Sequence, residues 1–296
     1  MTPPLASIPG VANVHTLHGP DADPTAPPGL LVEVPHGADT QAHYDALAQR
    51  LESPLPAHLD RFFHVNTDVG AWDVGLAAAQ QWVDADPTRS AVAIRCAIPR
   101  TFIDVNRVID VAVSDGLTPG LMPWITVPED RMLLRALHDR YTVLVRGAYQ
   151  RVCGAGGLAL IPHTYAPRTV PIDHIGMDIV DALERVYAPG VIEIAPLRPE
   201  VDLITVTPEG DDRSPPGVAD AFTEQLAAVG IAVERNGAYN LHPVTMGARW
   251  SNAWPGRVLC FEVRRDLVTH WEPFVTKALR ADGITTIARC LAHALG

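Results

Sequence analysis

The chain has 296 residues, of which 47% are hydrophobic and 19% are charged, a composition typical of a soluble globular protein. Its formal net charge is −11 and its pI is about 5.5, which disfavours binding to nucleic acid. No apolar run approaches the ~20 residues of a membrane-spanning helix, and the N-terminus lacks the basic and apolar regions of a signal peptide. The four cysteines are scattered without a CxxC pair, so we expect buried free thiols in a cytoplasmic protein.

The predicted elements alternate along the chain. Residues 1–28 are rich in proline and glycine, and we expect them to be irregular and to lie over the surface. Strands are predicted at residues 30–34, 91–95, 158–161, 191–195, 203–206, 231–235 and 258–263. Helices are predicted at residues 40–52, 72–84, 128–152, 174–187, 217–229 and 272–294. This alternation predicts one α/β domain over residues 29–296, with a mostly parallel or mixed sheet covered by helices on both faces.

Reactive side chains lie at or just beyond the carboxyl ends of three of these strands. His36 comes just after the strand at 30–34, His163 just after the strand at 158–161, and Glu262 near the end of the strand at 258–263. Functional groups collect at the carboxyl ends of strands in such sheets. The sequence therefore predicts that the three side chains point into one crevice.

These residue types match the needs of a catalytic zinc site. Such a site takes three nitrogen or oxygen ligands from the protein and leaves one position for water. His36, His163 and one carboxylate would supply the ligands, and the carboxylate is either Asp39 or Asp68. A further carboxylate, Glu262, could take the proton of that water and pass it to a leaving amine.

Other polar residues are candidates for holding a substrate. Arg107, in RTFIDVNR (residues 100–107), could bind a carboxylate or a developing oxyanion, with Asn106 beside it. Weaker candidates for lining the pocket are Arg168, Tyr239 and His242. Each residue alone also has an ordinary structural reading, such as a hydrogen-bonded histidine after a strand or an aspartate that caps a turn.

The order of the motifs adds information that no single motif carries. The chain contains, in this order, PHGA (35–38), NTD (66–68), RTFIDVNR (100–107), LIPHTYAPR (160–168) and FEVRRDL (261–267). This order resembles the N-formylglutamate amidohydrolase family over roughly residues 30–275. That family is distantly similar to the carboxypeptidase A-like zinc enzymes and to the aspartoacylase and succinylglutamate desuccinylase group. The sequence differs from the family pattern in having HT (163–164) where HS is usual.

The resemblance implies a fold and an activity. The fold would be a three-layer α/β/α sandwich with a mixed, mostly parallel central sheet, as in zinc carboxypeptidases. The activity would be zinc-dependent hydrolysis of an N-formyl or other short N-acyl amino acid, an anionic small molecule. One Zn²⁺ per chain would be held by His36, His163 and Asp68, with Asp39 as the alternative to Asp68. Glu262 would be the general base, and Arg107 would be a catalytic residue that also binds the substrate.

Two other functions remain open at this stage. A zinc carboxypeptidase-like peptide hydrolase would share the metal site and differ in its pocket. A non-catalytic binding protein would keep the fold and the ligands without hydrolysis. The sequence does not indicate an oligomeric state.

Overall fold

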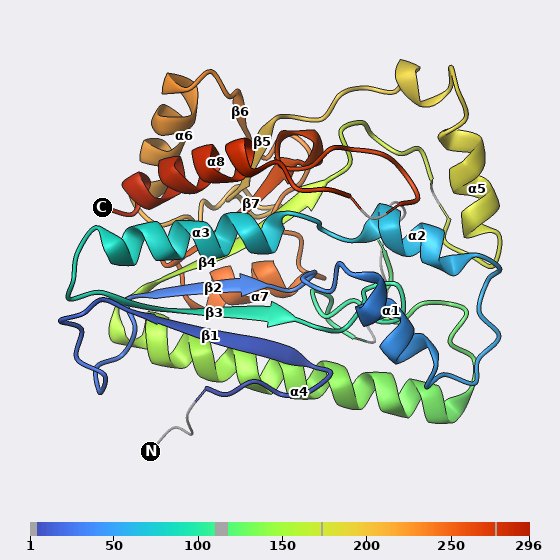
Figure 1. The fold of residues 1–296 in the computed structure, drawn as a ribbon, viewed down its shortest axis with the longest axis horizontal. Helices are drawn as coiled ribbons and strands as arrows, with labels where there is room; N and C mark the ends of the chain where they lie inside the picture. The colour runs from blue at the N-terminus through green and yellow to red at the C-terminus, as the bar shows by residue number, and fades with distance from the viewer. Residues whose placement is uncertain (1–4, 110–117, 173, 276) are drawn as a thin grey trace.

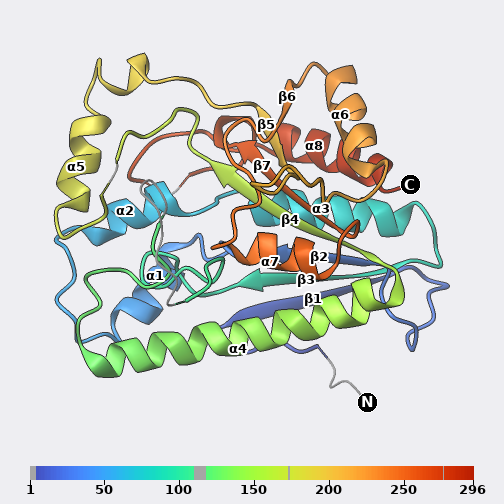
Figure 2. The same ribbon diagram turned by 180° about the vertical axis from the view of Figure 1, so that it is seen from behind.

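The computed structural model describes residues 5–109, 118–172, 174–275 and 277–296 (Figures 1 and 2). These residues form a seven-stranded sheet with the strand order β1-β3-β2-β4-β7-β5-β6. The strands are β1 (Ala12–His18), β2 (Leu30–Val34), β3 (Ser90–Cys96), β4 (Leu158–Tyr165), β5 (Val201–Ile204), β6 (Val233–Arg235) and β7 (Val258–Arg264). Within the described ranges, no helix is both long and apolar enough to cross a membrane.

The sheet is mixed. Strands β3, β2, β4 and β7 run parallel to one another, whereas β1 is antiparallel to β3 and β5 is antiparallel to β7. Because β6 is parallel to β5, three of the seven strands oppose the other four. The prediction of a mostly parallel sheet was therefore wrong, because only the four strands β3, β2, β4 and β7 form a continuous parallel set.

Helices cover both faces of this sheet. They are α1 (Gln41–Ala48), α2 (Leu59–Asn66), α3 (Ala71–Asp84), α4 (Pro128–Val152), α5 (Ile179–Val186), α6 (Val218–Ala228), α7 (Met246–Ala253) and α8 (Ala281–Ala294). One core cluster joins α3, α6 and α8 to one face, and a second cluster joins α4 and α7 to the other (Figure 1). Successive strand residues alternate between the two clusters, as the pleat of a strand requires. The expected three-layer α/β/α fold is confirmed.

Three predictions about single elements were wrong. The helix expected at residues 272–294 begins only at Ala281. Residues 12–18, expected to be irregular, form the edge strand β1, whose side chains are mostly exposed and so lack a strong apolar pattern. Residues 191–195, expected to be a strand, contain the short 3₁₀ turn Ile192–Ile194, and Ile194 is 85% exposed. Helices α2 and α7 were not predicted; each has only 8 residues. That residues 29–296 form one domain stays a prediction.

Candidate metal centre

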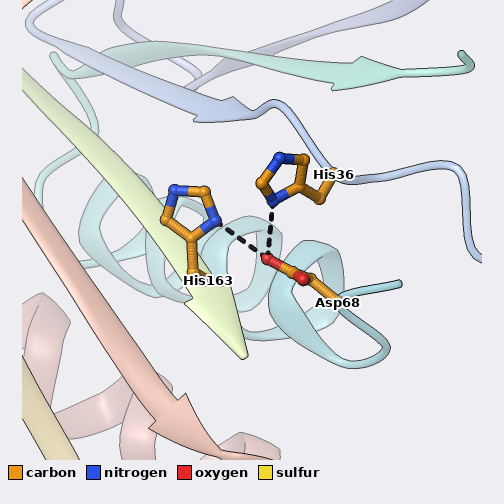
Figure 3. Close-up of side chains that lie close together, drawn as sticks. All are labelled: His36, Asp68 and His163. Atoms are coloured by element: carbon orange, nitrogen blue, oxygen red, sulfur yellow. Dashed lines mark hydrogen bonds and ion pairs between the residues drawn. The ribbon is translucent and has the colours of Figure 1, made fainter. Parts of the chain in front are cut away.

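Three buried side chains from distant parts of the chain meet at one end of the sheet. His36 lies two residues after β2, His163 lies in β4, and Asp68 lies in the loop between α2 and α3. One potential ligand atom from each residue lies within 4.8 Å of the others (Figure 3). The two histidines meet because β2 and β4 are parallel neighbours, so the carboxyl ends of both strands lie at the same end of the sheet. We call these residues the His–Asp–His cluster.

Asp68 joins the two histidines. Its Oδ2 atom lies 3.0 Å from His36 Nδ1 and 2.8 Å from His163 Nδ1. Burial alone would raise the pKa of Asp68, but the positive charge of His36 and the hydrogen bonds from both imidazoles hold that pKa well below its usual range. The carboxylate is therefore ionised, which is the form that binds a cation.

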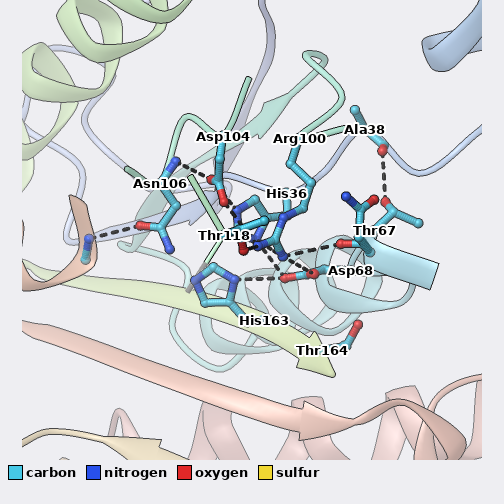
Figure 4. Close-up of polar contacts among 12 residues, drawn as sticks. His36, Ala38, Thr67, Asp68, Arg100, Asp104, Asn106, Thr118, His163 and Thr164 are labelled. Atoms are coloured by element: carbon cyan, nitrogen blue, oxygen red, sulfur yellow. Dashed lines mark hydrogen bonds and ion pairs between the residues drawn. The ribbon is translucent and has the colours of Figure 1, made fainter. Parts of the chain in front are cut away.

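A second carboxylate orients His36. Asp104 is fully buried, and its Oδ1 atom lies 2.8 Å from His36 Nε2 (Figure 4). A carboxylate on one ring nitrogen turns the other nitrogen toward a metal, which is the usual arrangement around metal-binding histidines. Asp104 Oδ1 also accepts a hydrogen bond from the backbone N–H of Asn106. The sequence suggested only this turn-capping role and missed the contact with His36.

Arg100 connects the two carboxylates. Its Nη2 atom donates to Asp104 Oδ2 at 3.1 Å, and its Nη1 atom lies 3.5 Å from Asp68 Oδ1. It also donates to Thr118 Oγ1 at 3.2 Å, so its guanidinium group is engaged within the protein. Its place as the first residue of RTFIDVNR was the only sequence signal for this role.

The loop after β2 explains why Asp68, and not Asp39, joins the histidines. Asp39 forms an ion pair with Arg95, whose Nε atom also donates to the Gly37 carbonyl at 2.8 Å. A Cβ atom at Gly37 would lie 2.5 Å from Arg95 Cγ, so only glycine lets the loop pack this closely. In the described chain, the cluster contains Asp68 and leaves Asp39 in its own ion pair.

Glu262 lies beside the His–Asp–His cluster. It is the direct β7 neighbour of His163 on β4, and both residues line the same cavity. Its Oε2 atom is buried without a hydrogen-bond partner in the described structure. Burial raises the pKa of Glu262 to about 7, with a smaller contribution from the charge of Asp68. A group with this pKa can take up and release a proton near neutral pH.

The cluster opens into a cavity of about 480 Å³. Asn106, Arg107, Tyr239 and His242 all line it, as the sequence predicted for a substrate pocket. Asn106 Oδ1 accepts a hydrogen bond from Gly247 N–H at 3.1 Å, which orients the side chain, and its amide N–H groups can donate to a ligand.

Arg198, and not Arg168, lines the cavity. Arg168 does not line the cavity and donates to the carbonyl of Ala195. The guanidinium of Arg198 lies 5.0 Å from the ring centre of Tyr165 and 5.7 Å from that of Tyr239, in cation–π contacts. No ion pair of Arg198 with an acidic side chain is found among the described residues.

The donor set fits zinc. Two imidazoles and one carboxylate are the three ligands that several catalytic zinc sites use. All three residues are buried, Asp68 is held in its charged form, and Asp104 orients His36. Glu262 lines the cavity beside these residues, and its Oε2 atom is buried without a hydrogen-bond partner in the described structure. The protein is thus a three-layer α/β/α protein with a candidate metal centre at the carboxyl ends of its parallel strands.

Comparisons with known proteins support the fold. No family model and no curated protein matches the sequence. The N-formylglutamate amidohydrolase from Ralstonia eutropha JMP134 has a similar structure, with a TM-score of 0.53 and 18% identity over 97% of this chain and 96% of that chain. The gene product Atu2144 from Agrobacterium tumefaciens gives a TM-score of 0.54 and 18% identity over 97% and 93% of the two chains. This chain therefore shares the fold of an N-formylglutamate amidohydrolase, as its motifs led us to expect.

Proposed function

We propose that this protein is a zinc-dependent amidohydrolase that cleaves the amide bond of an N-acyl amino acid. The observation that carries the proposal is the His–Asp–His cluster, whose ligand atoms lie within 4.8 Å of one another and next to Glu262. The shared fold with a protein named N-formylglutamate amidohydrolase supports the same reaction class.

His36, Asp68 and His163 would hold the metal. Bound Zn²⁺ supplies Lewis-acid activation of water and of the amide carbonyl. Asp104 keeps His36 Nδ1 directed at the cluster, because it occupies the other ring nitrogen. Arg100 contacts both Asp104 and Asp68 and would help to hold the two carboxylates in place.

Glu262 would transfer the proton. Its carboxyl group lines the cavity beside the His–Asp–His cluster and would accept the proton of an attacking water molecule. The same carboxyl group then donates the proton to the nitrogen of the leaving amino acid. Burial raises its pKa, which favours acceptance of the proton, and the positive charge of a bound Zn²⁺ would favour its release.

The substrate would be an anion held by arginines of the cavity. Arg107 and Arg198 both line the cavity, and the amide N–H groups of Asn106 can add hydrogen bonds. Arginine binds carboxylates through two parallel hydrogen bonds, which fixes the orientation of the substrate. An N-acyl amino acid presents such a carboxylate close to its amide bond.

Metal analysis combined with an amide hydrolysis assay tests the proposal. We expect one zinc ion per chain, release of free amino acid from an N-acyl amino acid, and loss of both in His36→Ala. His293→Ala, which removes an exposed histidine of α8, is the matched control and should keep both. The proposal fails if the protein binds no divalent metal and His36→Ala leaves turnover unchanged. Faster cleavage of dipeptides than of N-acyl amino acids would instead indicate a carboxypeptidase-like hydrolase.

A further inference from the structure

The cavity beside the metal centre has two unlike sides. Its polar side carries Asn106, Arg107, Arg198 and Tyr239. Its other side is formed by five aliphatic residues, which we call the apolar wall: Val170, Ile172, Ile175, Ile179 and Leu183. The apolar wall comes from the segment between β4 and β5, whose helix α5 packs against α2 at the end of the molecule (Figures 1 and 2).

Charges are confined to the polar side. Among the described residues between 170 and 183, none that lines the cavity is charged. Of the four arginines that line the cavity, three are engaged with the protein. Arg100 contacts Asp68 and Asp104, and Arg265 donates to the carbonyls of Val65 and Thr164. Arg107 donates to the carbonyls of Thr118 and Asn106. Arg198, which makes cation–π contacts with Tyr165 and Tyr239, is therefore the cation best able to meet an anionic ligand.

The apolar wall can stabilise only an apolar group. Val170, Ile172 and Ile175 are partly exposed, so a ligand that covers them removes apolar surface from water. A carboxylate placed against the same residues would lose its hydration without gaining a cation or a hydrogen bond. A cavity of about 480 Å³ is also in the size range that accepts a drug-sized ligand.

We propose that the substrate carries an apolar group that lies against the apolar wall, while its carboxylate binds on the side of Arg107 and Arg198. The inference rests on the proposed amidohydrolase function. The apolar group can belong to either end of an N-acyl amino acid. It is either the side chain of the amino acid or the acyl chain, and the two sources need separate tests.

Three substrates distinguish the possibilities in the zinc-loaded wild-type protein. N-formylphenylalanine carries the apolar group on the amino acid, N-hexanoylglutamate carries it on the acyl chain, and N-formylglutamate lacks it. We expect kcat/KM for at least one of the first two to exceed that for N-formylglutamate by tenfold or more, because a single methylene group in an apolar pocket already contributes about tenfold. The better of the two identifies the source of the apolar group.

A pair of variants ties the preference to the apolar wall. Ile172→Asn should lower the affinity for the preferred apolar substrate at least tenfold, measured by calorimetry in a Glu262→Gln background that does not turn it over. Ile194→Asn is the matched control, because Ile194 lies outside the cavity and is 85% exposed. It should leave the affinity unchanged, and thermal melts should show that both variants are folded.

Failure of this inference differs from failure of the proposed function. If N-formylglutamate is the best of the three substrates, or if Ile172→Asn and Ile194→Asn bind the apolar substrate equally well, the apolar wall does not select the substrate. The amidohydrolase proposal would then still stand. If none of the three substrates, and no other N-acyl amino acid, is hydrolysed, the proposed function itself is wrong.

Discussion

His163 and Glu262 are direct neighbours on the parallel strands β4 and β7. Residues paired in this way point to the same face of a sheet, so one strand brings a candidate ligand and the next brings a candidate base to the same place. The spacing is fixed by the backbone hydrogen bonds between these two strands. One strand pair thus positions one of the three candidate ligands and the candidate base.

This relationship leads to a prediction for Glu262→Gln. We expect kcat to fall by about 10²- to 10⁴-fold, because the amide cannot accept the proton of the attacking water. Zinc content should not change, since Glu262 is not one of the three ligands. Turnover with stoichiometric metal analysis checks both, and Glu224→Gln, an exposed change on α6, is the control. A drop in metal content equal to the drop in activity would show that Glu262 acts as a ligand.

Asp104→Asn tests the orientation of His36. Asp104 touches His36 Nε2 and not the metal position, so we expect zinc to bind about 10- to 100-fold more weakly while a stoichiometric site remains at saturating zinc. Competition with a chelator measures the dissociation constant directly. Asp139→Asn, at a carboxylate that is 82% exposed, should leave it unchanged. Equal affinities in wild type and Asp104→Asn would mean that the contact does not orient the ligand.

Arg198→Met tests recognition of the carboxylate. A charge-assisted hydrogen bond to a ligand contributes about 1.5–3 kcal/mol, so KM should rise roughly 10- to 100-fold with little change in kcat. The substrate and its C-terminal amide should be compared, because only the acid should lose affinity. Arg168→Met is the control from outside the cavity. If Arg168→Met has the larger effect, the assignment from the sequence was right and the one from the structure is wrong.

The buried Glu33 on β2 predicts a pH dependence of stability. Tyr141 and Tyr149 donate hydrogen bonds to it at 3.2 and 2.8 Å, and burial raises its pKa to about 7 from 4.5. Between these two values the folded state binds more protons than the unfolded state, so this group's contribution is fully present below pH 4.5 and is lost as the pH rises through 7. The loss is on the order of 3 kcal/mol.

Glu33→Gln should remove that loss. The free energy of unfolding of Glu33→Gln minus that of wild type should be larger at pH 8 than at pH 5. Denaturant titration at both pH values measures this difference. The amide keeps a hydrogen-bonding partner for the tyrosines and cannot ionise. Glu224→Gln should show no such change. A constant difference between Glu33→Gln and wild type at the two pH values would contradict the raised pKa.

Substitution of glycine by alanine should have opposite effects on stability at two helical positions. In α3, a Cβ atom at Gly75 would lie 2.7 Å from Val32 Cγ1 and 3.0 Å from Pro162 Cγ, whereas at Gly147 in α4 the nearest atom is 3.9 Å away. Gly147→Ala should stabilise the protein by up to about 1 kcal/mol through helix propensity. Gly75→Ala should destabilise it by about 1–2 kcal/mol because α3 must move away from the sheet. Thermal or denaturant unfolding checks both, and equal effects would contradict the close packing of α3.

The elements that the sequence predicted well have strong local signals. The helix expected at 128–152 is α4 (Pro128–Val152), because proline and two acidic residues define its first turn. The apolar residues of strands β2 and β7 are all buried, as expected for strands covered on both faces. By contrast, β1 is an exposed edge strand, and the apolar residues at 191–195 do not enter the sheet at all. Local pattern alone cannot separate these cases, because burial depends on what packs against the segment.

The sequence by itself determined which residue types could form the site: two histidines after strands, a glutamate on a strand, and the motif RTFIDVNR in the expected order. Only the tertiary structure shows that Asp68, and not Asp39, contacts both histidines. It also shows that Arg198, and not Arg168, lines the cavity, and that Asp104 contacts His36. These choices depend on distances between segments 32 to 95 residues apart and on which charges are already paired inside the protein. Contacts of this kind are set by the packing of the whole sheet, and no local stretch of sequence contains them.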